Sequence, residues 1–180
     1  MPRRPNILSM EFVLLALLER KSMHGYDLYQ TLTKTPGISK IWTIKQPLFY
    51  SYLEKLEKYG FIHAIQEEGE THLQRNRLEL TADGKEALDE WLSTPVRRPR
   101  DFRQELLAKM IIARWRGKEE LLGLIEDQMK ALRNWSKEVE FDEIPNDAWV
   151  DDWFVTTHKT FRLDSYIKWL ETCKKVANRV

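Results

Sequence analysis

The sequence is poor in the features that mark several common classes of protein. It has one cysteine in 180 residues, Cys173, so no disulfide can form within the chain, which fits a reducing compartment. No apolar run approaches the ~20 residues that a membrane-spanning helix needs, and polar and acidic residues near the start interrupt any signal-peptide core. With 42% hydrophobic and 32% charged residues the chain is expected to fold. We expect a cytoplasmic, globular protein with no membrane partner.

Groupings that carry catalysis or metal binding are also missing. The four histidines are dispersed, and no pair lies three or four residues apart beside a carboxylate partner. The sequence has no glycine-rich phosphate loop, no Gly-x-Ser-x-Gly elbow and no Cys-x-x-Cys pair. We therefore expect no enzyme activity, no catalytic residue, no metal and no cofactor.

Three helical patterns follow one another near the start. Residues 10–20 are apolar nearly all round, which predicts a central helix covered by its neighbours. After a turn at 21–25, a second helix opens at His24-Gly25-Tyr26 and ends before Pro36, because proline disfavours helix in the residue that precedes it. The third helix is predicted over 46–59 and ends at Gly60.

A two-stranded ribbon and a new helix come next. Residues 62–68 and 74–80 alternate loosely between apolar and polar, as strands do, and fold about Glu68-Gly69-Glu70. Thr81 has the side chain and the position of an N-cap for the helix that follows. This order of elements predicts a winged helix-turn-helix, an arrangement that usually places one helix in a groove of DNA.

The third helix has a core side and an exposed side. At 100° per residue, the core side holds Phe49, Tyr52, Leu53 and Leu56. The opposite side holds Gln46, Pro47, Tyr50, Ser51 and Glu54. Because the N-terminal residues of such a helix reach base edges, we predict DNA binding by Lys45, Gln46, Tyr50 and Ser51. The alternative for Tyr50 is a partly buried ring that packs against the second helix.

Net positive charge in residues 1–100 is confined to a few short segments. Residues 1–100 carry 15 Lys and Arg against 13 Asp and Glu, so DNA binding is supported by pattern more than by charge. Basic residues do occur in the N-terminal arm and in the returning strand, and we predict phosphate contacts by Arg3, Arg4, Arg75 and Arg77. The alternative for the two strand residues is a solvated strand face shared with Glu79.

Three motifs of this half resemble the PadR family of transcriptional regulators. They are His24-Gly25-Tyr26, the helix-to-wing segment 50–62, and Leu-Thr-Ala-Asp-Gly at 80–84. Segments 102–109 and 167–170 resemble the longer PadR subgroup with a virulence-activator-type helical C-terminal domain. The resemblance implies a DNA-binding regulator that responds to a small molecule or metabolic signal. Gln46-Pro47-Leu48 departs from the small residues usual there, so the family's operator preferences are not transferred.

The chain after the Pro- and Arg-rich segment 93–100 has a helical pattern throughout. We predict a winged helix-turn-helix domain at 1–92, a linker at 93–100 and a helical domain at 101–180. Asp101 can cap a helix that Gly117 closes. A seam follows at Leu122, Ile125, Met129, Leu132 and Val139. A last helix restarts at 144–147 and carries Trp153, Phe154, Phe161, Ile167, Leu170 and Ala177.

These helices present more apolar surface than one small domain can cover. We therefore predict a homodimer through the C-terminal helices, as two-fold readers of DNA need paired half-sites. The expected fold class is mainly α (α+β), an N-terminal winged helix-turn-helix with a C-terminal helical dimerisation domain.

Five of the seven tryptophans follow residue 100. Aromatic side chains can line a ligand pocket, and we predict a small aromatic effector near Trp149, Trp153 or Trp169. The alternative, that these side chains fill the core and the dimer interface, is the commoner use of tryptophan. The proline-rich segment 95–99 would let the angle between the two halves change.

Three functions fit these patterns. The first is a transcriptional regulator, a homodimeric repressor on an inverted-repeat operator of double-stranded DNA, relieved by a small effector. The second is a winged-helix protein-interaction module without DNA binding, which the weak net charge permits. The third is a helical ligand-binding or scaffold protein. Tight binding to a short inverted repeat, falling steeply with salt, separates the first from the others.

Overall fold

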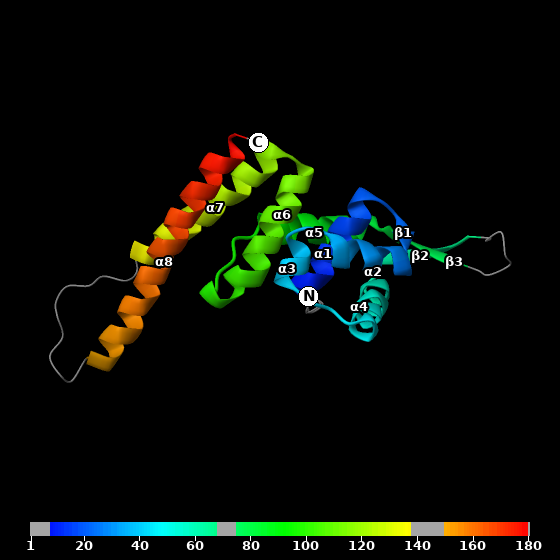
Figure 1. The fold of residues 1–180 in the computed structure, drawn as a ribbon, viewed down its shortest axis with the longest axis horizontal. Helices are drawn as coiled ribbons and strands as arrows, with labels where there is room; N and C mark the ends of the chain where they lie inside the picture. The colour runs from blue at the N-terminus through cyan, green and yellow to red at the C-terminus, as the bar shows by residue number, and fades with distance from the viewer. Residues whose placement is uncertain (1–7, 68–74, 138–149, 180) are drawn as a thin grey trace. The chain divides into compact units, whose positions relative to one another are not determined.

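The computed structural model describes residues 8–67, 75–137 and 150–179, and its fold is mainly α with one small sheet (Figure 1). The chain forms two compact units. The first contains residues 1–94 and 103–112, and the second contains residues 95–102 and 113–180. None of the helices in the described ranges is both long and apolar enough to span a membrane.

The first unit is built around α1 (Ser9–Arg20), in which every residue from 10 to 18 is buried. This confirms the prediction from its all-round apolar pattern. Helices α2 (Gly25–Lys34), α4 (Gln46–Lys58) and α5 (Ala82–Ser93) pack against it. The single-turn helix α3 (Ile38–Ile41) lies between α2 and α4 and was not predicted.

The sheet has three strands where the sequence predicted two. β2 (Ile62–Glu67) and β3 (Arg75–Leu80) pair antiparallel, with Ile62 opposite Leu80. Part of the predicted turn at 21–25 is a strand, β1 (Met23–His24), which also pairs antiparallel with β3, so the order is β1-β3-β2. Two residues are too short to show alternation, which is why the pattern missed this strand. The predicted ribbon tip at 68–70 lies outside the described residues.

The junction of α4, β2 and α5 is held by main-chain contacts. Gly60 ends α4 with a φ of 72°, a conformation that favours glycine. The Thr81 hydroxyl accepts from the Gly84 N–H at 3.0 Å, which confirms the predicted N-cap, and it donates to the Gly60 carbonyl at 2.7 Å. The Thr81 N–H donates to the Phe61 carbonyl at 3.1 Å. The first turn of α5 is therefore fixed against the end of α4.

The segment after α5 differs from the single capped helix that the sequence predicted. A 3-10 turn (Pro99–Asp101) and a π-helical turn (Phe102–Leu106) precede α6 (Leu107–Arg116). Asp101 is the last residue of the 3-10 turn and is followed directly by the π-helical turn, so it does not cap a regular helix as predicted. The two units interleave over residues 95–112, and the functional boundary at 93–100 stays a prediction.

A buried lysine holds the start of α6 to the first unit. Lys109 is 1% exposed, and its ammonium donates to the Thr94 carbonyl at 2.5 Å and lies 3.1 Å from a Glu105 carboxylate oxygen. It also lies 4.9 Å from the centre of the Trp91 ring, which stacks on Phe12 of α1 at 4.6 Å. Desolvation by burial lowers the pKa of Lys109, and Glu105 opposes that shift.

The second unit contains the antiparallel pair α7 (Lys118–Lys137) and α8 (Val150–Ala177). Gly117, with a φ of 139°, separates α6 from α7 as predicted. Ion pairs join Lys174 to Glu126 at 2.7 Å and Arg133 to Glu171 at 3.2 Å. The residues buried in this unit include Leu121, Ile125, Met129, Leu132, Leu163, Leu170 and Ala177.

The predicted seam is correct at its centre and wrong at its start. Leu121 is buried where Leu122 was predicted, and Val139 lies outside the described residues. Gln128 is also buried, at 2% exposure. Its amide donates to the Val96 carbonyl at 3.1 Å and accepts from the Val96 N–H at 2.7 Å. A polar side chain therefore lies on the inner side of α7 because it satisfies both main-chain groups of Val96.

Candidate DNA-binding surface

Helix α4 has the two sides that the sequence predicted. Phe49, Leu53 and Leu56 are buried and fix the helix to the first unit, and Tyr52 is half-buried. The Tyr29 ring meets Phe49 edge-on at 5.2 Å, and its hydroxyl donates to the Ile44 carbonyl at 3.2 Å. These contacts set the direction in which the opposite side of α4 points.

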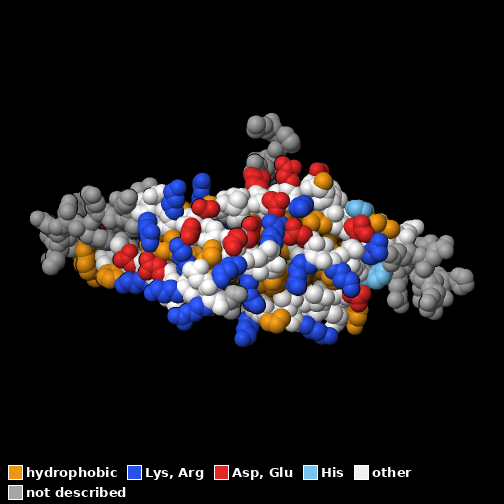
Figure 2. All heavy atoms as spheres, turned by 90° about the horizontal axis from the view of Figure 1, so that it is seen from above, with side chains coloured by type: hydrophobic (Ala, Val, Ile, Leu, Met, Phe, Trp, Pro, Cys, Tyr) orange, Lys and Arg blue, Asp and Glu red, His pale blue; other side chains and the backbone are white. Residues whose placement is uncertain are grey.

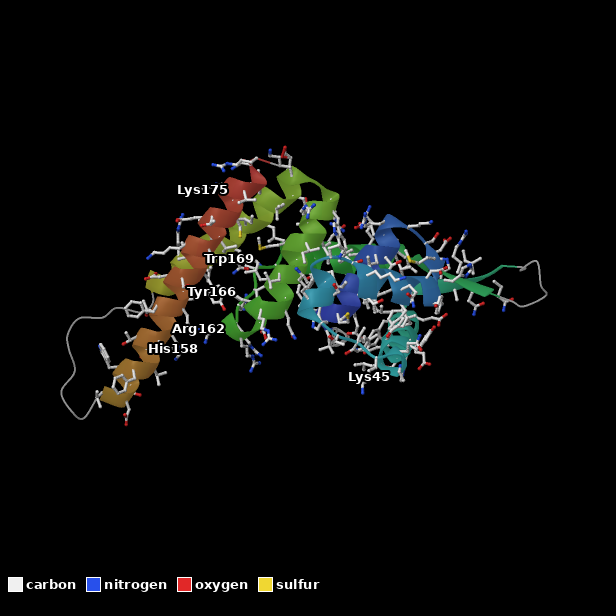
Figure 3. The ribbon with its side chains drawn as sticks, in the orientation of Figure 1. Lys45, His158, Arg162, Tyr166, Trp169 and Lys175 are labelled. Carbon is white, nitrogen blue, oxygen red and sulfur yellow. The ribbon has the colours of Figure 1, made fainter. Side chains whose placement is uncertain are left out.

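The exposed side of α4 brings together the four residues predicted on and beside it. Lys45 lies at the start of the helix (Figure 3), followed by Gln46, Tyr50 and Ser51, and all four side chains are exposed. Pro47 occupies the first turn, where its missing N–H costs nothing. The Ser51 hydroxyl donates to the Leu48 carbonyl at 2.8 Å and can still accept a hydrogen bond.

Tyr50 is partly exposed and partly packed against neighbouring residues. Its side chain is 41% exposed, so the hydroxyl can reach a ligand. Its ring also meets Phe49 edge-on at 5.2 Å and lies against Gly25 at the start of α2, where an added Cβ would be 3.3 Å from Tyr50 Cε1. The ring is therefore held in place by the protein while its polar end stays accessible.

An ion pair that the sequence analysis missed ties α4 to α1. The Lys55 ammonium lies 2.8 and 3.0 Å from the two carboxylate oxygens of Glu11, which is fully buried. Glu11 also accepts from the Leu8 N–H at 2.5 Å. A charged residue inside the apolar run of α1 was the available signal, because a carboxylate is buried only when it has partners.

The structure describes only some of the residues predicted to contact phosphate. Arg77 on β3 is half-buried, and its guanidinium lies 2.9 Å from Glu79 of the same strand. This ion pair agrees with the alternative given for Arg77, a strand face shared with Glu79. Arg75 begins β3, but its side chain is not described, and Arg3 and Arg4 lie outside the described residues. Figure 2 shows basic and acidic side chains interspersed on the visible face.

Two of the three residues predicted for an effector lie on α8. Trp153 and Trp169 are both half-buried, and Trp149 lies outside the described residues. Figure 3 shows Trp169 on the same helix as Tyr166, Arg162 and His158. Sixteen residues of helix separate Trp153 from Trp169, about 24 Å at 1.5 Å per residue. One small molecule can therefore contact only one of these two tryptophans.

Neither metal nor thiol chemistry is indicated in the part of the chain that the structure describes. No cluster of three His, Cys, Asp or Glu side chains there could hold a metal ion. Burial raises the pKa of the Cys173 thiol, which lowers the share of the reactive thiolate.

The fold and its exposed helix define a winged helix-turn-helix protein. Residues 14–90 match the transcriptional regulator PadR-like family. A relative from Bacillus subtilis (strain 168), "Negative transcriptional regulator PadR", is 26% identical over 121 residues. These residues make up 67% of this chain and 65% of the relative, so the match spans less than two thirds of the relative's length.

Solved structures of Bacillus subtilis PadR are similar to this chain only loosely. The crystal structure in complex with operator DNA has a TM-score of 0.47 at 22% identity, covering 94% of this chain and 99% of that one. The structure in complex with p-coumaric acid has a TM-score of 0.43 at 21% identity, covering 95% and 99%. The similarity to the PadR-like family comes from the sequence match, which ends at residue 90. Helical α6, α7 and α8 are consistent with the virulence-activator-type C-terminal domain, which stays a prediction.

Proposed function

We propose that this chain is a DNA-binding transcriptional regulator that acts as a homodimeric repressor on an inverted-repeat operator. The observation that carries the proposal is α4 of the PadR-like domain, whose inner side is locked into the core while Gln46, Tyr50 and Ser51 remain exposed. The name of the Bacillus subtilis relative, a negative transcriptional regulator, supports repression. The regulator is proposed to be cytoplasmic and without enzyme activity.

In this proposal α4 and the wing have different tasks. Lys45, Gln46, Tyr50 and Ser51 face the major groove, where polar side chains discriminate base edges. Arg75 and Arg77 contact phosphates from the wing, and Arg3 and Arg4 contact them from the N-terminal arm. Phosphate contacts position the protein without reading sequence. For Arg77, binding means exchanging Glu79 for a phosphate.

Fluorescence anisotropy with the DNA immediately upstream of the protein's own gene tests this assignment. Gln46→Ala or Tyr50→Phe should lose roughly 1–3 kcal/mol on the operator and little on random DNA. Arg77→Ala should weaken both and flatten the salt dependence. Asn134→Ala, an exposed amide on α7, is the matched control and should change neither. Unchanged operator affinity in all three test variants would refute the groove assignment.

The homodimer is proposed to form through the first half of α8. Phe154 and Phe161, seven residues apart on one face of the helix, are 58% and 70% exposed. The ion pairs of α8 with α7 involve residues 171 and 174, whereas α8 begins at residue 150. Figure 1 shows α8 continuing beyond the described end of α7. A second copy of the chain is the proposed cover, because a two-fold operator requires two copies.

Light scattering distinguishes this dimer from other arrangements. Phe161→Lys should shift the mass at micromolar concentration from dimer to monomer, since a charge would be buried in the interface. Val176→Lys is the matched control, because Val176 is 55% exposed near the other end of α8. A wild-type monomer, or a dimer that survives in Phe161→Lys, would exclude this interface.

A small aromatic effector is proposed near one of the tryptophans of α8. A ligand changes operator affinity only through different affinity for two states of the protein. Aromatic acids, with p-coumaric acid as the first probe, should quench tryptophan fluorescence and weaken operator binding in step. Trp153→Leu and Trp169→Leu, tested separately, should remove the response in one variant only. A response retained in both would place the effector elsewhere.

The alternative, a winged-helix protein-interaction module without DNA binding, is favoured by one observation. Asp27, Glu54 and Glu57 are exposed on α2 and α4, and carboxylates repel phosphate. A DNA titration with no salt-dependent binding to either operator or random sequence would favour this alternative over the repressor.

A further inference from the structure

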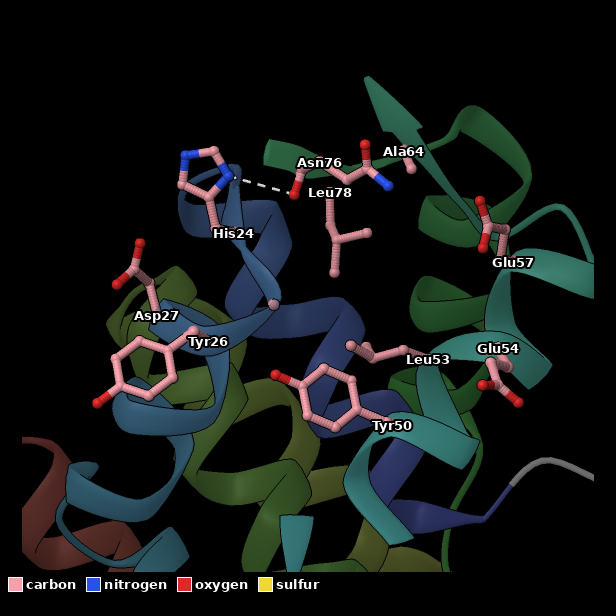
Figure 4. A pocket seen from close by; sticks show the side chains of 11 residues that line it. His24, Tyr26, Asp27, Tyr50, Leu53, Glu54, Glu57, Ala64, Asn76 and Leu78 are labelled. Atoms are coloured by element: carbon pink, nitrogen blue, oxygen red, sulfur yellow. Dashed lines mark hydrogen bonds between the residues drawn. The ribbon is translucent and has the colours of Figure 1, made fainter. Parts of the chain in front are cut away.

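A hollow in the first unit lies beside the exposed side of α4. Its volume is about 730 Å³, which is within the ~300–1,000 Å³ of typical small-molecule sites. It is bounded by the start of α2, by α4, and by β2 and β3 (Figure 4). Its floor is apolar, with Leu53 and Leu78 buried and Ala64 half-buried. The hollow can therefore hold the apolar body of a ligand.

Tyrosine forms one wall of this hollow. Figure 4 shows the Tyr50 ring beside Leu53, with its hydroxyl directed toward the side where Tyr26 lies. Tyr26 is 60% exposed and Tyr50 is 41% exposed. Contact with Phe49 and with Gly25 holds the Tyr50 ring in position. The face of a tyrosine ring attracts cations within about 6 Å.

The charge of the lining has one sign. Asp27 lies on one side of the hollow and Glu54 and Glu57 lie on the opposite side (Figure 4), and no Lys or Arg is among the described residues that line it. None of these three carboxylates pairs with a basic side chain within the described ranges. The His24 Nδ1–H donates to the Asn76 carbonyl at 3.2 Å. A concave surface lined by one sign of charge concentrates counter-ions of the other sign.

We propose that this hollow binds a small organic cation, an amine or quaternary ammonium carried on a flat apolar body of one or two rings. The body lies on Leu53 and Leu78, and the cationic group lies between the Tyr50 ring and the carboxylates of Glu54 and Glu57. Apolar floor, aromatic wall and unpaired carboxylates are the three elements that such a ligand needs. An anion of the same shape is repelled.

The site goes beyond the proposed function, because the free protein binds the cation whether or not it binds DNA. Tyr50 belongs both to this hollow and to the proposed DNA surface. Where the proposed function also holds, cation and operator compete for this side chain. The two proposals can therefore fail separately.

Calorimetry with two probes of the same shape and opposite charge tests the site. 1-Naphthylmethylammonium should bind the full-length protein about tenfold more tightly than 1-naphthylacetate, a difference of about 1.4 kcal/mol. Glu54→Gln/Glu57→Gln should reduce that preference to about twofold or less. Glu86→Gln/Glu119→Gln removes the same charge from exposed positions of α5 and α7 and should keep the preference. Equal thermal unfolding of the two double variants shows that both remain folded.

Every other outcome counts against the site. Equal affinity of the two probes for the wild type, or no binding of either, overturns the proposal. A tenfold preference that survives in Glu54→Gln/Glu57→Gln places the cation elsewhere. A preference lost equally in the control variant reduces the effect to overall charge. None of these measurements uses DNA, so a failure of the repressor proposal leaves this result interpretable.

Discussion

Replacing Gly84 with alanine tests the close packing where α5 meets the end of α4. A Cβ at this position would lie 2.1 Å from the Phe61 carbonyl oxygen and 2.8 Å from a Leu80 methyl group. The Leu80 methyl can rotate away, but the Phe61 oxygen is main chain and already accepts the Thr81 N–H at 3.1 Å. The added methyl group therefore has to push the first turn of α5 away from β2.

Two effects of opposite sign decide the magnitude. Alanine is normally favoured over glycine inside a helix by about 1 kcal/mol. Overpacking a buried position costs about 1–3 kcal/mol, and weakening the hydrogen bond between Thr81 and Phe61 costs about 1 kcal/mol more. The free energy of unfolding should therefore fall by about 2 kcal/mol. For a chain of this size the melting temperature should fall by about 4–8 °C.

Thermal and urea unfolding followed by circular dichroism measure this loss. Gly123→Ala in α7 is the matched control, because nothing lies within 4 Å of a Cβ placed there. The control should equal the wild type or gain up to about 1 kcal/mol. A Gly84→Ala protein as stable as the wild type would refute the packing argument and leave helix propensity as the dominant effect.

Three further predictions concern the segment that carries Lys109. Lys109→Ala should lower the free energy of unfolding by about 2 kcal/mol, since it leaves a cavity at a buried position. The similarly long Lys109→Met fills that space and should lose less than about 1 kcal/mol in urea unfolding, although Glu105 loses its partner in both variants. Burial lowers the pKa of Lys109 below its ordinary 10.5, so just below that pH the unfolded chain binds more protons than the folded one. Wild-type stability relative to Lys109→Met should accordingly rise with pH in this interval, as pH-dependent urea titrations would show. A chain cut after residue 112 should unfold cooperatively in calorimetry, whereas a chain cut after residue 100 should melt several degrees lower, because residues 103–112 belong to the first unit.

The features predicted correctly are those whose signal lies within a few neighbouring residues. The apolar run of α1, the two sides of α4 and the Thr81 cap each depend on local spacing and on one side-chain type. Strand β1 is different, because two residues form a strand only when β3 is already beside them. Leu121 and Leu122 are adjacent and chemically identical, so the register of α7 follows from its partner helix and not from its own pattern.

The same difference between local and long-range signals applies to the candidate DNA-binding surface. The exposed side of α4 was predicted, because it is the complement of a local apolar stripe. The contact of Tyr50 with Gly25 joins residues 25 positions apart, and the pair of Glu11 with Lys55 joins residues 44 apart. Lys109 has the side chain of a surface residue, and its burial depends on Trp91, Thr94 and Glu105 together. The assignment of individual residues to DNA stays a prediction.

The interleaving of the two units sets a limit on how this protein can be recombined with its relatives. The main chain passes from one unit to the other after residues 94, 102 and 112, and the last of these passages lies within α6. A chimera joined at 93–100 would keep the winged helix and take residues 103–112 from the other parent. It would lose Lys109 and its contacts with Thr94 and Trp91. The segment that has to be exchanged as one piece is therefore the winged helix together with the first half of α6.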